Sequence, residues 1–304
     1  MNGIINIYKP SGITSHTVVA KMKRFSGVKR VGHSGTLDPM AKGVLPVLVG
    51  SAASVQELIT GHDKVYRAGI LFGKVTDTAD ITGEVLEENK VDFTEERLDE
   101  VIKTFIGKQM QTPPMYSALK VDGQKLCDLA RKGIEVERKA REITIYDIKK
   151  VTGFDGTRID IDVSCSKGTY IRTLAEDIGK ALGCGACLDS LERLQCGVYK
   201  AEDAVSIDTL QELYDKGDTD SIEALLTSPK VLFDELKSVK LPAFYVRLSL
   251  NGAEIYLKKI KCAPDTFEKS DMCKLLDDKG EFYAVGELKD YPDGKAIKIR
   301  YRFV

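Results

Sequence analysis

Residues 32 to 46 read GHSGTLDPMAKGVLP, and this stretch decides which fold and which site the sequence predicts. The 37 residues before Asp38 include six Lys or Arg and no Asp or Glu, so Asp38 is the first carboxylate of the chain. It lies in a loop of small residues, where Pro39 restricts the backbone directly after it and orients the carboxylate in advance. The apolar run GVLPVLVG at 43–50 follows and is typical of a buried strand.

The cations that precede Asp38 are expected to keep its carboxylate ionised and ready to act as a nucleophile or a base. Opposite charges nearby favour the charged form of an acid, so the sequence predicts a pKa below the ordinary value for Asp38. His33 lies in the same polar loop, and by itself it is more typical of a structural hydrogen-bonding residue than of a catalyst.

Outside this loop, helical and strand patterns alternate without a regular strand–helix–strand rhythm. We expect strands at 4–8, 43–50, 64–73 and 159–165, and helices that begin at Thr14 or Ser15, at Thr94, and after the KGT turn at 167–169, the last of them ending at Gly183. This mixture predicts an α+β fold with a mixed, mostly antiparallel central sheet flanked by helices.

The character of the sequence changes near residue 241. Short strand-like runs are separated there by turn signals such as NG at 251, and the final run KAIKIRYRFV alternates apolar and cationic side chains. This pattern is typical of a small β-rich domain. We therefore expect one domain at 1–235 and a second at 236–304.

Composition places the 304-residue chain among globular proteins, since 43% of its residues are hydrophobic and 30% are charged. Its longest apolar run is far shorter than the roughly 20 residues of a spanning helix, and the N-terminus lacks a signal-peptide pattern. The seven cysteines are an odd number scattered along the chain, which favours reduced thiols over a disulfide framework. We expect a soluble, cytoplasmic protein without membrane contact.

The net charge of −1 hides an uneven arrangement of charges. Residues 1–37 are cationic, residues 120–141 carry seven cations against four acids, and acids crowd at 84–100 and 202–235. This arrangement suits a basic face for a polyanion, although a run of charges is also commonly no more than a solvated surface.

Three tempting motifs fail when their spacing is tested. GVKRVGHS at 27–34 resembles a phosphate-binding loop, but His33 occupies the position of the required Lys. CGAC at 184–187, with Cys165 and Cys196, has the donors for a four-thiolate zinc site, yet the pair straddles a helix end, and small buried side chains are the simpler interpretation. His33, Asp38 and a Ser would compose a hydrolase triad, but no GxSxG turn holds the Ser.

Several blocks resemble one family, in the same order, along nearly the whole chain. The blocks are YKPSGITSH at 8–16, RVGHSGTLDPMAKGVLPV at 30–47, KVYRAGILFGKVTDTADITG at 64–83, PPMYSALKVDGQKLCDLARKGIEVERKAREI at 113–143, SKGTYIRTLAEDIG at 166–179 and LERL at 191–194. They resemble the bacterial tRNA pseudouridine-55 synthases of the TruB type. Residues 240–304 match the family least; there the resemblance implies a PUA-like RNA-binding barrel.

The resemblance implies the pseudouridine-synthase fold and a reaction. A uridine in the T loop of tRNA is detached from ribose at N1, turned, and rejoined through C5. Because this isomerisation neither gains nor loses atoms, no redox cofactor, nucleotide cofactor or metal is implied. The target base must leave its stack, as in other base-flipping enzymes, which costs a few kcal/mol.

The resemblance also implies roles for residues of the site. Asp38 is the catalytic aspartate, and three routes stay open: attack at C1′ of ribose, attack at C6 of the base, and removal of a ribose proton to give a glycal-type intermediate. Tyr66 stacks on the target base and is a candidate for removing the C5 proton. Arg172 pairs with Asp38 and, if the KGTYIR segment is extended, shares a strand face with Tyr170. Tyr170 and Leu191 line the pocket.

Further residues are expected to contact the RNA. By the same resemblance, His33 occupies the space that the flipped base leaves. The inserted loop at about 113–143 closes over the T loop, and its cations meet phosphates without reading the base sequence. The candidate RNA contacts are Lys9, Lys120, Lys125, Arg131, Lys132 and Arg141.

The sequence therefore predicts an isomerase, a tRNA pseudouridine synthase that binds the T arm of tRNA and works as a monomer. The alternative is a tRNA-binding or tRNA-folding factor that uses the same basic face without chemistry. Asp38 separates the two, because only the enzyme needs its carboxylate.

Overall fold

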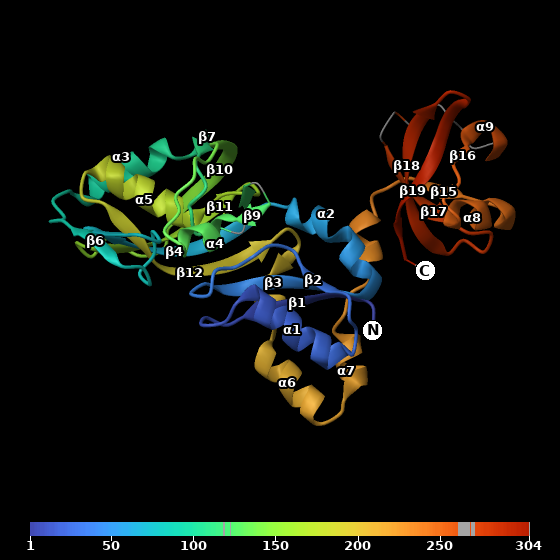
Figure 1. The fold of residues 1–304 in the computed structure, drawn as a ribbon, viewed down its shortest axis with the longest axis horizontal. Coiled ribbons are helices and arrows are strands. Elements are labelled where there is room, and N and C mark those ends of the chain that lie inside the picture. Colours follow the sequence, from blue (N-terminus) through green and yellow to red (C-terminus); the bar gives the residue numbers. More distant parts are fainter. Residues whose placement is uncertain (118, 122, 261–267, 269–270, 304) are drawn as a thin grey trace.

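The computed structural model describes residues 1–117, 119–121, 123–260, 268 and 271–303, and the side chains of Lys120 and Lys125 lie outside this description. Two β-sheets dominate the described part (Figure 1). The larger is built from strands between residues 3 and 206, and the smaller from strands between 238 and 302.

The large sheet has ten strands in the order β14-β1-β3-β12-β4-β11-β10-β7, with β13 beside β12 and β2 beside β3. Their bounds are β1 Gly3–Lys9, β2 Val31–His33, β3 Lys42–Val49, β4 Lys64–Phe72, β7 Gly107–Gln111, β10 Arg141–Lys150, β11 Arg158–Cys165, β12 Ala186–Cys196, β13 Tyr199–Lys200 and β14 Val205–Ser206. β1 runs parallel to β14 and β3 to β12, and the other pairs run antiparallel. The predicted mixed, mostly antiparallel sheet is confirmed.

The sequence of β11 shows how one strand supplies two different faces. Its apolar side chains Ile159, Ile161, Val163 and Cys165 are fully buried. The residues between them, Asp160, Asp162 and Ser164, are only partly buried, because successive side chains of a strand point to opposite faces. The large sheet therefore has an inner, apolar face and an outer, polar face at this strand.

Helices cover the inner face in two groups (Figure 1). α1 Ser15–Ser26, α6 Ile207–Asp215 and α7 Thr219–Ala224 lie together beside β1 and β3, whereas α3 Glu95–Thr104 and α5 Ile171–Leu182 lie together beside β4 and β12. Side chains from α1, α3, α5 and the sheet share one hydrophobic core. α1 begins where predicted, since the Thr14 hydroxyl accepts a hydrogen bond from the Thr17 amide, and α5 ends at Gly183, which adopts the left-handed φ of 81°.

Shorter elements connect these layers. They are α2 Gln56–Thr60, α4 Leu126–Ala130, the 3₁₀ turns η1 Gly50–Val55, η2 Ala201–Asp203 and η3 Pro229–Phe233, and the hairpins β5 Lys74–Thr76 with β6 Val85–Glu88 and β8 Lys120–Val121 with β9 Gln124–Lys125. None of the helices in the described ranges is long and apolar enough to cross a membrane.

The C-terminal sheet has five strands in the order β15-β17-β18-β19-β16. Their bounds are β15 Ser238–Lys240, β16 Ile255–Tyr256, β17 Met272–Leu276, β18 Phe282–Tyr291 and β19 Gly294–Arg302, and the helices α8 Ala243–Leu250 and α9 Leu257–Ile260 lie beside it. The predicted small β-rich unit is present, and it has a hydrophobic core of its own.

A second hydrophobic cluster joins the two sheets. It combines Ile4, Leu48 and Ile59 from the N-terminal part with Val285 and Tyr301 from β18 and β19. Phe233 packs among them, with ring centroids 5.8 Å from Tyr301 and 5.6 Å from Phe303. A domain boundary near residue 235 remains a proposal. The second hydrophobic cluster packs the N-terminal and C-terminal parts against each other.

Candidate active site

A cleft of about 550 Å³ opens beside the loop that carries Asp38. It is lined by Ser34, Gly35, Thr36, Leu37, Asp38, Thr60, Lys64, Tyr66, Ser117, Leu119, Arg141, Glu142, Ile143, Ser166, Lys167, Gly168, Thr169, Tyr170, Ile171, Arg172, Leu191 and Arg193. These residues come from the β2–β3 loop, β4, β12, the start of β10 and the N-terminal end of α5. Segments far apart in the sequence therefore converge on one carboxylate.

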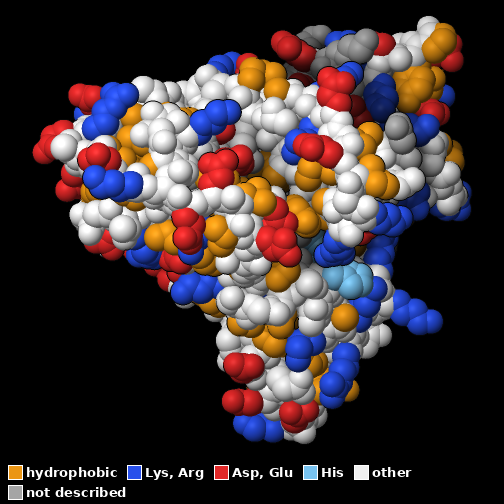
Figure 2. All heavy atoms as spheres, turned by 60° about the vertical axis from the view of Figure 1, so that its left-hand side comes forward, with side chains coloured by type: hydrophobic (Ala, Val, Ile, Leu, Met, Phe, Trp, Pro, Cys, Tyr) orange, Lys and Arg blue, Asp and Glu red, His pale blue; other side chains and the backbone are white. Residues whose placement is uncertain are grey.

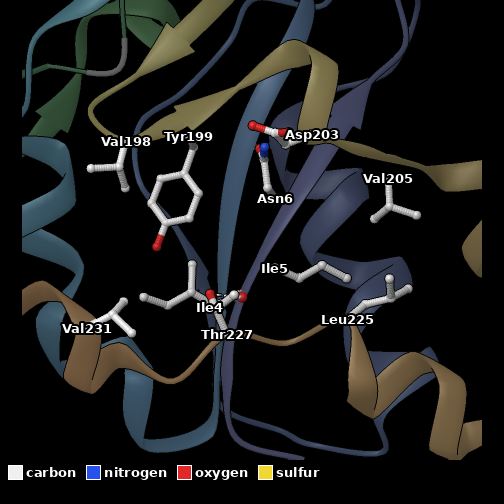
Figure 3. Close-up of a pocket in the computed structure, with 10 residues that line it drawn as sticks. All are labelled: Ile4, Ile5, Asn6, Val198, Tyr199, Asp203, Val205, Leu225, Thr227 and Val231. Carbon is white, nitrogen blue, oxygen red and sulfur yellow. Dashed lines mark hydrogen bonds between the residues drawn. The ribbon is translucent and has the colours of Figure 1, made fainter.

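A smaller cavity of about 280 Å³ lies beside β1, near β13, β14 and η3 (Figure 3). Most of its lining side chains are aliphatic, among them Ile4, Ile5, Val198 and Leu225. One acidic residue, Asp203, lines this cavity, and it forms no ion pair within the described residues. The larger cleft, with Asp38 and Arg172, is therefore the candidate active site.

The loop that carries Asp38 is tied down on both sides. The Ser15 hydroxyl accepts a hydrogen bond from the Leu37 amide at 2.8 Å and donates to the Leu37 carbonyl at 3.1 Å. The Ala41 amide donates to the carbonyl of Asp38 at 3.1 Å, and Gly35 adopts a φ of 143° that favours glycine. The start of α1 thus holds the backbone one residue before Asp38, which gives the carboxylate a defined position.

Arg172 holds the carboxylate of Asp38. Its Nε lies 2.9 Å from Asp38 Oδ2, and the Arg172 side chain is 6% exposed. The same guanidinium donates to the carbonyls of Thr78 at 3.0 Å and Tyr116 at 2.7 Å. The expected ion pair is present. The helix expected after the KGT turn holds Arg172 in its first turn, directly after Tyr170, which excludes the alternative of an extended KGTYIR segment with both side chains on one strand face.

A second carboxylate, Asp80, lies 3.8 Å from Arg172 Nη1 and is buried. Its Oδ1 accepts hydrogen bonds from the hydroxyls of Thr78 at 2.9 Å and Thr82 at 2.6 Å and from the Thr82 amide at 3.0 Å. Ala79, which lies between Thr78 and Asp80 in the chain, has a φ of 58°, which is uncommon for a residue with a side chain. Sequence reasoning missed Asp80, because TDTAD reads as an ordinary polar turn.

The expectation that nearby cations lower the pKa of Asp38 is wrong. Burial of the carboxylate raises the pKa above its ordinary value of 3.8, and this effect outweighs the opposing effect of Arg172. Asp80 adds to the increase because it carries a like charge. A carboxylate with a raised pKa is a stronger base, which suits proton removal and nucleophilic attack alike.

Tyr66 and Leu191 lie on neighbouring strands, β4 and β12, and both line the cleft. Tyr66 is 9% exposed, and burial raises the pKa of its hydroxyl to about 12, so the phenol keeps its proton at neutral pH. Tyr170 lies at the N-terminal end of α5, where Gln111 brackets its backbone with hydrogen bonds of 2.8 and 3.0 Å. No motif or pattern in the sequence indicated that Gln111 contributes to the site.

His33 ends β2, immediately before the first residue that lines the cleft. Its Nδ1 accepts a hydrogen bond from the Gly35 amide at 3.2 Å. Burial lowers the pKa of His33 below its ordinary value of 6.5, so the ring is neutral at neutral pH. The structure places His33 at the rim of the site, outside the cleft lining.

Lys9 is a correction to the expected RNA contacts. Its side chain is fully buried, and its Nζ donates to the carbonyls of Pro10 at 2.9 Å, Ile13 at 2.8 Å and Pro39 at 3.4 Å. Burial lowers the pKa of Lys9 to about 8. This cation therefore supports the turn after β1 and the backbone next to Asp38, and it does not reach a phosphate.

The other expected RNA contacts lie on or beside the inserted loop. Arg131 and Lys132 are exposed after α4, and Arg141 is exposed at the start of β10 and lines the cleft. The backbones of Lys120 and Lys125 pair in the β8–β9 hairpin, but their side chains fall outside the described part of the structure. Figure 2 shows Lys and Arg gathered along the right-hand edge of the lower lobe, beside histidine side chains.

The CGAC segment passes from the end of α5 into β12. Cys184 and Cys187 are buried, as are Cys165 and Cys196. Burial raises the pKa of the Cys187 thiol to about 11. Within the described residues no group of three or more His, Cys, Asp or Glu side chains is arranged to hold a metal ion.

Comparison with known proteins assigns the family. Residues 23–171 match the model of the TruB family pseudouridylate synthase N-terminal domain, and residues 172–234 match that of the tRNA pseudouridylate synthase B C-terminal domain. The chain is 41% identical over 300 residues to tRNA pseudouridine synthase B of Clostridium perfringens (strain 13 / Type A), covering 98% of each chain. It is 46% identical over 211 residues to tRNA pseudouridine synthase B of Azoarcus sp. (strain BH72), covering 69% of this chain and 70% of that one.

The fold agrees with this assignment. A chain in the crystal structure of a Cbf5-Nop10-Gar1 complex superimposes with a TM-score of 0.71 at 27% identity, covering 99% of this chain and 84% of that chain. Together, the family models and the near-complete overlap with the relatives show that this chain belongs to the TruB family of pseudouridylate synthases.

Proposed function

We propose that this chain is a tRNA pseudouridine synthase that isomerises the T-loop uridine at position 55, with Asp38 as its catalytic residue. The relatives of the same length are named tRNA pseudouridine synthase B, which supports tRNA as the substrate. The observation that carries the role of Asp38 is its geometry: a carboxylate in a cleft, 2.9 Å from a buried guanidinium and with a raised pKa.

The cleft suits a single nucleoside that has left its stack. The reaction breaks the N1–C1′ bond and forms a C5–C1′ bond; C5 releases a proton to water and N1 takes one up, so its atoms balance without a second substrate. Unstacking the base costs a few kcal/mol, and stacking on an aromatic face returns about 1 to 3 kcal/mol. Tyr66 offers this face. Arg172 holds Asp38 in place, and attack at C1′, attack at C6 and proton removal from ribose all remain compatible with this arrangement.

The surface around the cleft supports a polyanionic partner. Lys23 and Arg24 on α1 are exposed, as are Arg131 and Lys132 beside the inserted loop. Phosphate contacts made by exposed cations of this kind position RNA without selecting bases. Tight binding of the T arm should therefore weaken steeply as salt rises, because each phosphate contact releases a counterion.

The C-terminal sheet is proposed as a second RNA contact, a PUA-like domain at 236–304. Lys295, Arg300 and Arg302 are exposed on β19. The proposed enzyme acts as a monomer and works in the cytoplasm with its tRNA. Light scattering of the 33.5 kDa chain with and without tRNA measures its oligomeric state.

Replacing Asp38 by Asn tests the proposed function. Release of tritium from C5 of uridine in labelled tRNA should fall by at least about a thousandfold, while the affinity for tRNA stays within about tenfold, because the isostere removes the reactive group alone. Asp162→Asn is the matched control, since Asp162 pairs with Arg67 on the outer face of the same sheet. Turnover by Asp38→Asn would exclude Asp38 as the catalyst.

The same assay separates the alternative and the target position. A tRNA-folding factor without chemistry would show no tritium release from the wild type at all. A tRNA with cytidine at position 55 should give no release from the wild type if that uridine is the target. Release that persists with this substrate would place the target elsewhere in the tRNA.

A further inference from the structure

Arg193 has no role in the site described so far, although it lies at the centre of it. In the pairing of β12 with β4 it stands opposite Tyr66, and in the pairing of β12 with β3 it stands opposite Gly43. Directly paired residues of neighbouring strands place their side chains on the same face, a few ångströms apart. Arg193 therefore lies beside the tyrosine proposed to stack on the base.

The guanidinium of Arg193 bridges the two ends of the catalytic loop. Its Nε donates to the Val44 carbonyl at 2.7 Å, and its Nη2 donates to the Gly35 carbonyl at 3.3 Å. Asp38 lies between these two residues in the chain. The positive charge of Arg193 also opposes the effect of burial on the pKa of the Tyr66 phenol. One side chain thus holds the catalytic loop and lies beside Tyr66 on the neighbouring strand.

The backbone of β3 approaches the backbone of Arg193 closely. Gly43 has a φ of 105°, and a Cβ there would lie 2.3 Å from the carbonyl oxygen of Arg193, so only glycine allows β3 to approach β12 so closely. The pairing of β12 with β4 shifts its register directly after Arg193. Such an irregularity redirects a side chain and is common next to active sites.

The burial of the charged Arg193 side chain is energetically unfavourable. The side chain is 1% exposed and, among the residues that the structure describes, it forms no ion pair with a carboxylate. Its titratable neighbours Lys9, His33 and Lys64 are bases and offer no negative charge, and Arg193 lowers the pKa of each. An apolar side chain would avoid the cost of burying a cation without a counterion, so packing alone does not explain an arginine at this position.

We propose that Arg193 is a positioning residue for the isomerisation. Its planar fork sets the distance between the Asp38 loop and Tyr66, so that a base stacked on Tyr66 meets the carboxylate in a reactive geometry. This inference rests on the proposed function of the cleft. Lysine cannot replace arginine in this role, because a single ammonium group lacks the spread donors that reach the carbonyls of Val44 and Gly35 together.

Arg193→Lys tests the proposal by tritium release, with each variant assayed well below its melting temperature. The rate constant kcat should fall about 10- to 100-fold, with the KM for tRNA within about threefold, since a misplacement of about 1 Å in the site costs up to about 100-fold in rate. Arg67→Lys is the matched control, because Arg67 follows Tyr66 on β4 but forms its ion pair with Asp162 on the outer face. The control should keep the wild-type kcat.

A spectroscopic readout separates positioning from general support of the fold. In protein carrying ¹³C-labelled tyrosine, the ring signal of Tyr66, identified by its loss in Tyr66→Phe, should move in Arg193→Lys and stay in place in Arg67→Lys. If Arg193→Lys does not fold, Arg193→Gln, whose amide still donates one hydrogen bond, is measured in the same way.

Each result has one meaning. A wild-type kcat in the folded Arg193 variant, or an unmoved Tyr66 signal, would overturn the proposal. A raised KM with an unchanged kcat would also overturn it, because Arg193 would then be an RNA contact. An inactive wild type would instead count against the proposed function, which keeps the two failures apart.

Discussion

The inner and outer faces of the large sheet carry the same chemistry in two settings. On the inner side, Arg172 Nε lies 2.9 Å from Asp38, and on the outer face Arg67 Nε lies 2.8 Å from Asp162. The side chain of Arg172 is 6% exposed, whereas that of Arg67 is 45% exposed. The geometry of the two ion pairs is alike, and their burial differs.

Burial decides what each pair does. An exposed ion pair contributes about 0 to 1 kcal/mol to stability, because water and salt screen both charges. Inside the cleft the same attraction competes with the loss of hydration, and the pKa of Asp38 rises despite its partner. The inner pair therefore holds a carboxylate with a raised pKa in a cleft, and the outer pair is a surface contact.

Arg172→Lys, at the buried ion pair, should have the largest effect on activity and stability. Lysine has no fork, so at most some of the contacts to Asp38, Thr78 and Tyr116 survive, and kcat should fall at least about 100-fold. Each buried carbonyl that loses its donor should also cost about 1 to 3 kcal/mol of unfolding free energy. Tritium release and urea unfolding measure the two effects. Activity within about threefold of the wild type would show that the guanidinium is dispensable.

The pH dependence of the rate should report the setting of Asp38. A nucleophilic or basic carboxylate must be ionised, and burial raises its pKa, so the rate should rise with pH through an apparent pKa above the ordinary value of 3.8. Below that pKa, single-turnover rates should change about tenfold per pH unit. An acidic limb centred below the ordinary value would mean that the cations outweigh burial after all.

Asp80→Asn should have a smaller effect than loss of Arg172. The carboxylate of Asp80 raises the pKa of Asp38, so its removal should move the acidic limb to lower pH. Loss of this anchor for Arg172 should lower kcat about tenfold through misplacement. Asp160→Asn, which removes a partner of Arg158 on the outer face, is the control for an Asp-to-Asn change in the same sheet. An acidic limb that stays in place would argue against electrostatic coupling of the two acids.

Arg67→Met should have the smallest effect. The exposed pair with Asp162 is lost, so the unfolding free energy should change by less than about 1 kcal/mol and kcat by less than about twofold. Urea unfolding and tritium release measure both on the same preparation. A large loss of activity would mean that the outer face also meets the RNA.

The sequence predicted the elements whose patterns are local. Thr14 before α1, Gly183 after α5 and the alternation in β11 each depend on a few neighbouring residues, so periodicity and caps found them. The sequence left open whether Arg172 lies on a strand or in the helix after the KGT turn, because TYIR next to a turn is compatible with either structure until the packing of α5 is known. The shift in the pKa of Asp38 was predicted in the wrong direction, since burial is a property of the fold and not of the neighbouring residues in the sequence.

The amino-acid sequence by itself determined the family and the α+β class and singled out Asp38 as the candidate catalyst, because these depend on motifs and periodicities that one chain carries in order. Only the tertiary structure decided that Lys9 is internal, that Asp80 lies beside Arg172 and that Arg193 stands opposite Tyr66. The physical reason is that hydration, charge coupling and hydrogen-bond reach act through space. Residues more than 100 positions apart, such as Asp38 and Arg172, acquire their chemistry from the distance that folding leaves between them.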